Sequence, residues 1–161
     1  MAVSRFGDWD RAKALLASHP GARLTLAIRK ATLKNALFLV CEIKRGIQKQ
    51  APGDKAFVKL AESTILKKGS SKALIDTGFL LNSITQKILA DQAFVGLLRG
   101  TVNKDGEEMV NIGAVMEFGA TIHHPNGAVI VIPARPFLHP TMEKYRDRVV
   151  ENYRQAIRTA F

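Results

Sequence analysis

The sequence predicts a single α+β domain, in which a long N-terminal helix and a C-terminal helix pack on a small antiparallel β-sheet of about four strands in two hairpins. The 161 residues fit one ordinary domain, and 47% hydrophobic with 24% charged residues is a globular composition. Apolar residues recur at helical spacing near both ends of the chain. Between these stretches, short apolar runs alternate with tight-turn residues, which predicts the hairpins.

The first fifty residues predict two helices of unequal length. Residues 1–20 form a predicted docking arm, because Asp8 is a suitable N-cap for a short helix that ends before Pro20-Gly21. Its apolar residues are Trp9, Ala12, Leu15 and Leu16. A longer helix is expected from residue 22 to about residue 50, roughly 40 Å in length at a rise of 1.5 Å per residue. The apolar stripe expected on this helix consists of Leu26, Ile28, Leu33, Ala36, Leu37, Val40 and Ile47.

The middle of the chain predicts short elements separated by turns. The run Ala51-Pro52-Gly53-Asp54 ends the long helix, because proline removes a donor and glycine supplies a flexible turn. Residues 57–68 are expected to form a loop followed by a short helix. Asp76-Thr77-Gly78 predicts the start of one helical turn, since Asp and Thr oxygens accept the unpaired N–H groups there. The first expected hairpin has strands at residues 83–90 and 93–98 and turns at Asp91-Gln92. The second has strands at residues 120–124 and 128–132.

The last third predicts two further helices around the second hairpin. Residues 110–118 are expected to form a helix that Gly119 ends as a C-cap. Pro125-Asn126-Gly127 supplies the hairpin turn, because Asn-Gly tolerates positive φ. The prolines of Pro133-Ala134-Arg135-Pro136 hold the arginine on a stiff loop. Pro140 suits the first turn of the last helix, whose expected apolar stripe is Met142, Tyr145, Val149, Tyr153, Ala156 and Ile157.

Positive charge is concentrated in the N-terminal half. The formal net charge is +10, and between Arg11 and Lys72 fourteen Lys and Arg residues face only three acidic ones. Such a field favours a polyanionic partner, either nucleic acid or an acidic protein surface. A solvated helix surface is the equally weighted alternative. The basic residues expected to face a polyanion are Arg23, Lys30, Lys34, Arg45 and Lys49.

The sequence nominates no catalytic, cofactor-binding or metal-binding residues, and we expect no enzyme activity and no cofactor. Gly-rich phosphate loops, HExxH helices, GxSxG elbows and CxxC pairs do not occur. The single cysteine, Cys41, has apolar neighbours, which favours a packed core thiol. His139 precedes Pro140, where a helix-capping role is the plainer interpretation. A small metal-dependent hydrolase that uses His123, His124 and Glu117 is the weakest alternative function.

Two isolated charges invite a pairing. Glu117 lies between apolar neighbours, and Arg135 lies between prolines. A bidentate arginine can fix a carboxylate in one geometry, so we expect a salt bridge between these two side chains.

Four segments, taken in order, resemble the phage virion morphogenesis family of Mu-like phages and prophages. They are Ala51-Pro52-Gly53-Asp54-Lys55 through Lys67, Leu74-Ile75-Asp76-Thr77-Gly78-Phe79-Leu80 through Ser83-Ile84, Glu117-Phe118-Gly119, and Ile132-Pro133-Ala134-Arg135-Pro136-Phe137-Leu138. The family is similar to the wider group of tail-completion and neck proteins that join heads to tails. The motif and interface residues that the resemblance implies are Asp76, Thr77, Gly78, Glu117, Phe118, Gly119, Pro133, Arg135, Pro136 and Phe137.

The resemblance implies a non-enzymatic structural protein of tail completion or head-tail joining, with self-association in a ring. Its partners would be other neck, connector or tail proteins, and any DNA contact would be nonspecific. The host bacterial cytoplasm during assembly, and then the neck or tail end of the virion, are the implied locations. No membrane partner is expected, since a membrane span needs about 20 apolar residues and the longest apolar run here, residues 36–41, has six. A basic nucleic-acid-binding protein is the main alternative.

Overall fold

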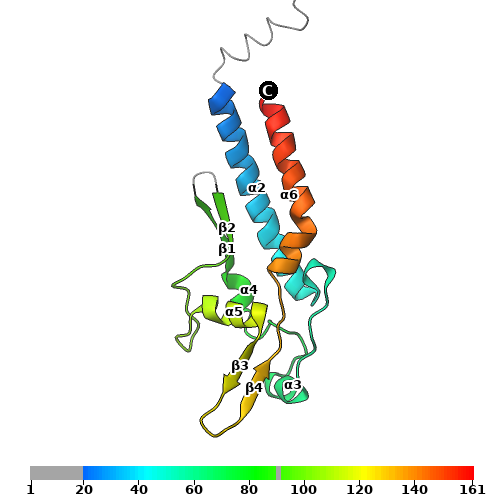
Figure 1. Cartoon of the computed structure of the whole chain (residues 1–161), viewed down its shortest axis with the longest axis vertical. Coiled ribbons are helices and arrows are strands. Elements are labelled where there is room, and N and C mark those ends of the chain that lie inside the picture. Colours follow the sequence, from blue (N-terminus) through cyan, green and yellow to red (C-terminus); the bar gives the residue numbers. More distant parts are fainter. Residues whose placement is uncertain (1–19, 90–91) are drawn as a thin grey trace, which may run out of the picture.

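The computed structural model describes residues 20–89 and 92–161 and confirms the α+β fold (Figure 1). The predicted arm before Pro20 and the predicted turn at Asp91 lie outside the described residues. The elements, in order, are α2 (Pro20–Gln48), η1 (Pro52–Asp54), α3 (Glu62–Lys68), α4 (Phe79–Ser83), β1 (Ile84–Leu89), β2 (Gln92–Leu97), α5 (Met109–Phe118), β3 (Ala120–His123), β4 (Val129–Ile132) and α6 (His139–Ala160).

Helices α2 and α6 lie side by side and antiparallel, and together they form a stalk above the rest of the molecule (Figure 1). The 29 residues of α2 make it about 43 Å long at 1.5 Å per residue. Hydrogen bonds cross the stalk: the Tyr153 hydroxyl donates to Thr32 Oγ1 over 2.9 Å, and the Asn152 amide donates to Asn35 Oδ1 over 2.6 Å. Because Thr32 and Asn35 are buried, these bonds satisfy groups that would otherwise destabilise the interface.

The apolar stripe predicted for the long helix is wrong in part. Leu26, Leu33 and Leu37 are 54%, 44% and 45% exposed, and Cys41 is exposed rather than packed in the core. The buried face of α2 instead includes Thr32, whose hydroxyl accepts a hydrogen bond from Tyr153. A search for apolar residues at helical spacing does not find such a polar residue. The members of the stripe that are buried as predicted are Ala36, Val40 and Ile47.

The apolar stripe predicted for the last helix is also only partly buried. Tyr145 and Tyr153 turn toward α2, where their hydroxyls donate to Glu42 and Thr32. Met142 and Ile157 are 45% and 41% exposed.

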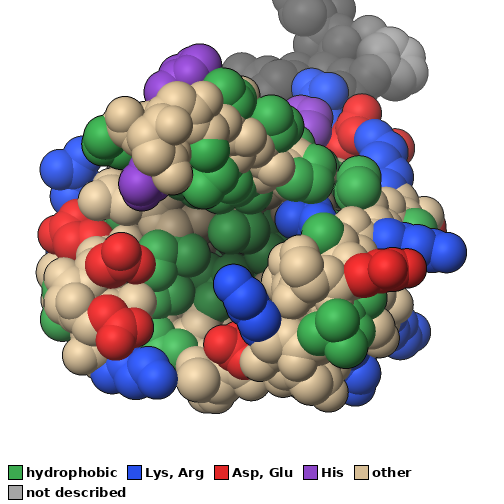
Figure 2. All heavy atoms as spheres, turned by 90° about the horizontal axis from the view of Figure 1, so that it is seen from below, with side chains coloured by type: hydrophobic (Ala, Val, Ile, Leu, Met, Phe, Trp, Pro, Cys, Tyr) green, Lys and Arg blue, Asp and Glu red, His purple; other side chains and the backbone are tan. Residues whose placement is uncertain are grey.

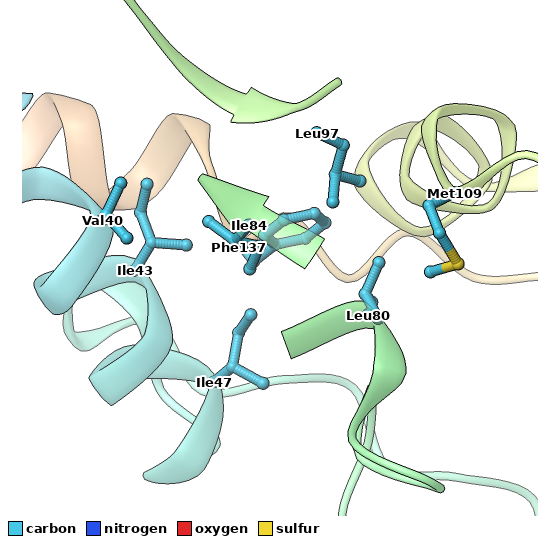
Figure 3. Close-up of a cluster of buried hydrophobic side chains, with 8 residues drawn as sticks. All are labelled: Val40, Ile43, Ile47, Leu80, Ile84, Leu97, Met109 and Phe137. Carbon is cyan, nitrogen blue, oxygen red and sulfur yellow. The ribbon is translucent and has the colours of Figure 1, made fainter. Parts of the chain in front are cut away.

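The hydrophobic core lies at the foot of the stalk. Side chains from α2, α4, both strands of the first hairpin, α5 and the loop before α6 point toward one another there (Figure 3). Phe137 is 0% exposed at the centre of this cluster. The core residues are Val40, Ile43, Ile47, Leu80, Ile84, Leu97, Met109 and Phe137.

The four strands form two separate two-stranded sheets. β1 pairs antiparallel with β2, with Ile84 opposite Leu97, and this hairpin packs against α2. β3 pairs antiparallel with β4, with Ala120 opposite Ile132, at the end of the molecule farthest from the start of α2 (Figure 1). Among the described elements, no helix packs on the second hairpin as α2 packs on the first.

The predicted start of α4 and the predicted end of α5 are confirmed. α4 starts one residue after Gly78, which adopts a φ of 77°, and the Thr77 hydroxyl oxygen accepts the N–H of Phe79 over 3.4 Å. Gly119 ends α5 with an N–H donated to the Val115 carbonyl over 2.8 Å. Within the described residues, we find no helix with the length and apolar character of a membrane span.

Candidate functional site

Segments that are far apart in the sequence surround one hollow below the stalk, which we call the lower groove. Its walls are residues 59–64 with α3, residues 74–80, residues 102–105, α5 and β4, and its volume is about 1180 Å³. Seen from below, hydrophobic side chains gather in the hollow and charged side chains lie around it (Figure 2). The predicted motif residues that line the lower groove are Asp76, Thr77, Gly78, Pro133 and Arg135.

Glu117 is a buried carboxylate that caps the last helix from another element. One oxygen accepts the backbone N–H groups of Phe137 and Leu138 over 2.7 and 3.0 Å, and the other accepts that of His139 over 2.9 Å. α6 has no cap from its own N-cap side chain, at Leu138. A negative charge at a helix start is stabilising, so Glu117 locks α5 to the beginning of α6. The prediction that His139 caps this helix is wrong. The N–H groups at the helix start donate to Glu117, and the side chain of His139 is exposed.

Arg135 is a buried guanidinium that lines the lower groove and joins the loop before α6 to residues 58–59. Its Nε donates to the Val58 carbonyl over 2.8 Å, and one Nη donates to the Lys59 carbonyl over 3.0 Å. A third, longer contact reaches the Pro133 carbonyl at 3.5 Å. Burial lowers the pKa of Arg135, and these carbonyl acceptors stabilise its charged form.

The predicted salt bridge between Glu117 and Arg135 does not form. Each side chain is 8% exposed or less, and each is satisfied by backbone groups rather than by the other charge. The two segments are joined instead through their backbones, since the Arg135 N–H donates to the Met116 carbonyl over 2.7 Å. Sequence reasoning failed here because it considers side chains as partners, whereas backbone donors and acceptors occur at every position.

The remaining motif residues have different places. Phe137 belongs to the core and Pro136 is half-buried, so both support the fold. Phe118 is 81% exposed. Gly119 has a φ of 77°, and a Cβ there would lie 2.9 Å from the Ile132 carbonyl oxygen, so this close approach of β4 requires glycine.

β4 is the part of the lower groove that sequence analysis did not foresee. Its residues Val129, Ile130 and Val131 are 55%, 48% and 67% exposed, although a wholly apolar strand is typical of a buried position. The His124 N–H donates to the Ala128 carbonyl, and the antiparallel ladder then directs the backbone groups of Val129 and Val131 away from β3. β4 therefore presents both apolar side chains and an outer backbone edge.

The charged residues of the lower groove lie beside this apolar lining. They include Lys59, Lys68 and Lys104 with Asp76 and Asp105. Burial lowers the pKa of Lys68, while the neighbouring charge of Asp76 opposes that shift and Arg135 adds to it. An apolar hollow with a few charged groups of both signs suits a segment of protein chain.

The predicted polyanion-facing residues fall into two groups. Arg23, Lys30 and Lys34 are exposed and line a shallow hollow of about 500 Å³ between α2 and α6. Arg45 pairs with Glu42, which offsets its charge, and Lys49 is exposed just beyond the helix end.

The residues of the hydrolase alternative do not form a site together. Both oxygens of Glu117 are occupied by backbone N–H groups, whereas His123 and His124 are exposed on the second hairpin. In residues 20–89 and 92–161, no cluster of three or more His, Cys, Asp or Glu side chains could hold a metal ion. Comparison of the chain with protein-family models, with curated proteins and with solved structures gave no match.

Proposed function

We propose that this protein is a non-enzymatic structural subunit that assembles through the lower groove and the adjacent β3–β4 hairpin, in tail completion or head-tail joining of a bacteriophage. Self-association in a ring, with further contacts to neck, connector or tail proteins, is the assembly we propose. It would take place in the host bacterial cytoplasm and leave the protein at the neck or tail end of the virion. The resemblance of four ordered segments supports the phage assignment, and the surface described next supports assembly.

The observation that carries the proposal is the exposed apolar β3–β4 hairpin. Ile122, Ile130 and Val131 are between 45% and 67% exposed, and a two-stranded hairpin alone is marginally stable in water. Large exposed apolar patches in soluble proteins mark interaction sites. A neighbouring subunit that covers this hairpin would remove its apolar side chains from water.

The outer edge of β4 supports the same proposal. Backbone groups of Val129 and Val131 point away from β3, and an unpaired edge can accept a strand from another chain. We propose that a segment of a second copy pairs with this edge and fills the lower groove. Repeated around an axis, such a head-to-tail contact closes into a ring.

Deletion of the gene from its phage or prophage tests the role in assembly. Lysates should contain filled heads beside unjoined or wrongly terminated tails in electron micrographs, and a complementing copy should restore joined particles. Normal infectious particles from the deletion would contradict the proposal.

Substitution in the hairpin tests the surface. Val131→Asp places a charge on the groove wall of β4, and Leu66→Asp makes the same kind of change on α3, where Leu66 is 83% exposed outside the groove lining. We expect Val131→Asp to fail in complementation and to weaken self-association in analytical ultracentrifugation. Leu66→Asp should behave as wild type, and equal behaviour of the two variants would refute a role for the lower groove.

A nucleic-acid-binding protein is the second candidate, favoured by the exposed cluster of Arg23, Lys30 and Lys34. If these residues contact phosphates, Lys30→Glu with Lys34→Glu should reduce the slope of log K against log salt by about 0.9 per lost contact. Lys87→Glu, an exposed change on β1, is the matched control. A slope that is unchanged in the double variant would remove this candidate.

A further inference from the structure

The β3–β4 hairpin has a second outer backbone edge, on β3. Thr121 and His123 lie opposite Val131 and Val129 in the hairpin. These positions alternate with the hydrogen-bonded pairs of the antiparallel ladder, so the backbone groups of Thr121 and His123 point away from β4. Among the described residues, these groups have no other backbone hydrogen-bond partner. The outer edges of β3 and β4 can therefore pair with each other between two copies of the chain.

Phe118 stands two residues before β3 and is the most exposed aromatic side chain of the described residues, at 81%. Met109, Ile112 and Met116 of the same helix line the lower groove, whereas Phe118 does not. Phe118 follows Met116 by two residues, which is a turn of about 200° around the helix axis. One copy thus presents an apolar side chain on one side of α5 and an apolar hollow on the other, an arrangement that suits a head-to-tail contact.

The register of the hairpin would bring Phe118 of one copy to the lower groove of another. If Thr121 of one copy lies opposite Val131 of the next, Phe118, three residues earlier, falls beside residues 133–135. Of these residues, Pro133 and Arg135 line the lower groove. The volume of about 1180 Å³ is above the range of about 300–1,000 Å³ for small-molecule sites, which leaves room for a segment of chain.

Leu66 of α3 is as exposed as Phe118, at 83%, but it is a poorer occupant of this groove. The two residues after Leu66 are lysines, and the groove is itself lined by four basic and two acidic residues. Like charges brought together in this way oppose association. The other exposed residues on the side of α5 that carries Phe118 are Asn111 and Ala114, which have no charge.

A two-fold contact between the β4 edges is the other way to join two copies at this hairpin. Such a contact would place Ile130 opposite Ile130 of the second copy, because the outward groups of Val129 and Val131 lie on either side of it. It would use the β4 edge of each copy and would end at a dimer, with both β3 edges unused. Pairing of β3 with β4 uses both edges of every copy and can continue until a ring closes.

We propose that Phe118 of one copy enters the lower groove of the next, while β3 of the first copy pairs with the outer edge of β4 of the second. This inference rests on the proposed assembly function and identifies residues 118–123 as the segment that fills the groove. A phenylalanine buries about 150–250 Å², a small part of the about 1,200–2,000 Å² of a stable interface. Phe118 is therefore the anchor of the contact, and the paired strands supply its remainder.

Phe118→Ala in the full-length protein tests the anchor. We expect analytical ultracentrifugation to show self-association that is weaker by about 30-fold or more, the loss typical of a central aromatic residue. Leu66→Ala removes an equally exposed side chain and is the matched control, with self-association equal to that of wild type. Equal association constants for Phe118→Ala and wild type would overturn the inference.

Cysteine substitutions test the pairing of the strands in a Cys41→Ser background, since Cys41 is the single native cysteine. Thr121→Cys and Val131→Cys are placed in separate chains, because within one chain these positions already face each other. Opposite residues of paired strands have Cα atoms about 4.5–5.5 Å apart, within disulfide range. We expect the mixed chains to join under mild oxidation. Efficient joining of Ile130→Cys to itself would instead show the two-fold contact and overturn the inference.

The results separate this inference from the proposed function. If wild type self-associates and Val131→Asp weakens that association, but the mixed cysteine chains do not join, another segment fills the lower groove and this inference alone fails. If wild type does not self-associate, or if Val131→Asp behaves like Leu66→Asp, assembly through the lower groove fails together with it.

Discussion

Two regions that are neighbours along the chain differ in which side chains they bury. One is the junction between α5 and α6, and the other is the β3–β4 hairpin. At the junction, the charged side chains of Glu117 and Arg135 are buried and hydrogen-bonded to backbone. In the hairpin, the apolar side chains of Ile130 and Val131 are 48% and 67% exposed. Polarity therefore does not decide burial here: a charge is buried where partners are fixed, and an apolar strand stays exposed where no described element covers it.

The comparison assigns different tasks to the two regions. The junction closes the fold, because it ties the end of α5, the loop at residues 57–59 and the start of α6 into one unit. The hairpin contributes no residue to the core cluster, and contact with a partner is the role that we propose for its surface. Substitutions at matched residues should separate these tasks.

The largest effect is expected from matched phenylalanines in the core and beside the hairpin. Phe137→Ala should lower the free energy of unfolding by about 3–5 kcal/mol, because it empties a fully buried position. Phe118→Ala, at an 81% exposed side chain, should change it by less than about 0.5 kcal/mol. Urea unfolding followed by circular dichroism measures both. Similar losses in the two variants would break the comparison.

Two glycines with similar backbone angles differ in their surroundings. Gly53 has a φ of 59°, and a Cβ there would lie 2.2 Å from the backbone oxygen of Pro140 at the start of α6. Gly69 has a φ of 68° with nothing within 4 Å of an added Cβ. Gly53→Ala should cost about 2–4 kcal/mol, from steric displacement added to backbone strain. Gly69→Ala should cost only about 1 kcal/mol, and thermal unfolding of both variants separates the two contributions.

The buried carboxylate of Glu117 should contribute to the free energy of unfolding mainly through the N–H groups that it accepts. Glu117→Gln keeps the shape but replaces one acceptor oxygen by a donor, so at least one N–H among residues 137–139 loses its partner. We expect a loss of about 1.5–3 kcal/mol in the free energy of unfolding. Faster amide hydrogen exchange at residues 137–139 would localise the effect. Unchanged protection of these amides would show that the cap is dispensable.

The smallest effect is expected from an exposed carboxylate on the last helix. Lys55 donates to Glu143 over 2.9 Å and lowers the pKa of that carboxyl. A lowered folded-state pKa means that the pair stabilises the protein above the ordinary glutamate pKa of about 4.3, and that this contribution is lost as the pH falls through the lowered value. Glu143→Gln should be slightly less stable than wild type at pH 7, and the difference should disappear in acid. Thermal unfolding between pH 7 and pH 3 measures this, with the exposed Glu107→Gln as control.

Local patterns in the sequence were sufficient for most element boundaries. Gly119 was expected to end a helix and does so, and Pro140 lies in the first turn of α6 as predicted. Helix stops and turns depend on the backbone preferences of one or two residues, which any surrounding structure must respect. The second hairpin was placed within a residue of its observed strands for the same reason.

The sequence by itself thus determined the α+β class, the order of the elements and their turns, because these depend on short-range spacing and backbone geometry. Only the tertiary structure decided which faces are covered. The buried side of α2 depends on hydrogen bonds that Thr32 and Asn35 accept from residues of α6 more than 110 positions away. Glu117 and Arg135 likewise found backbone partners rather than each other. Such choices follow from the mutual packing of distant segments, which local periodicity does not contain.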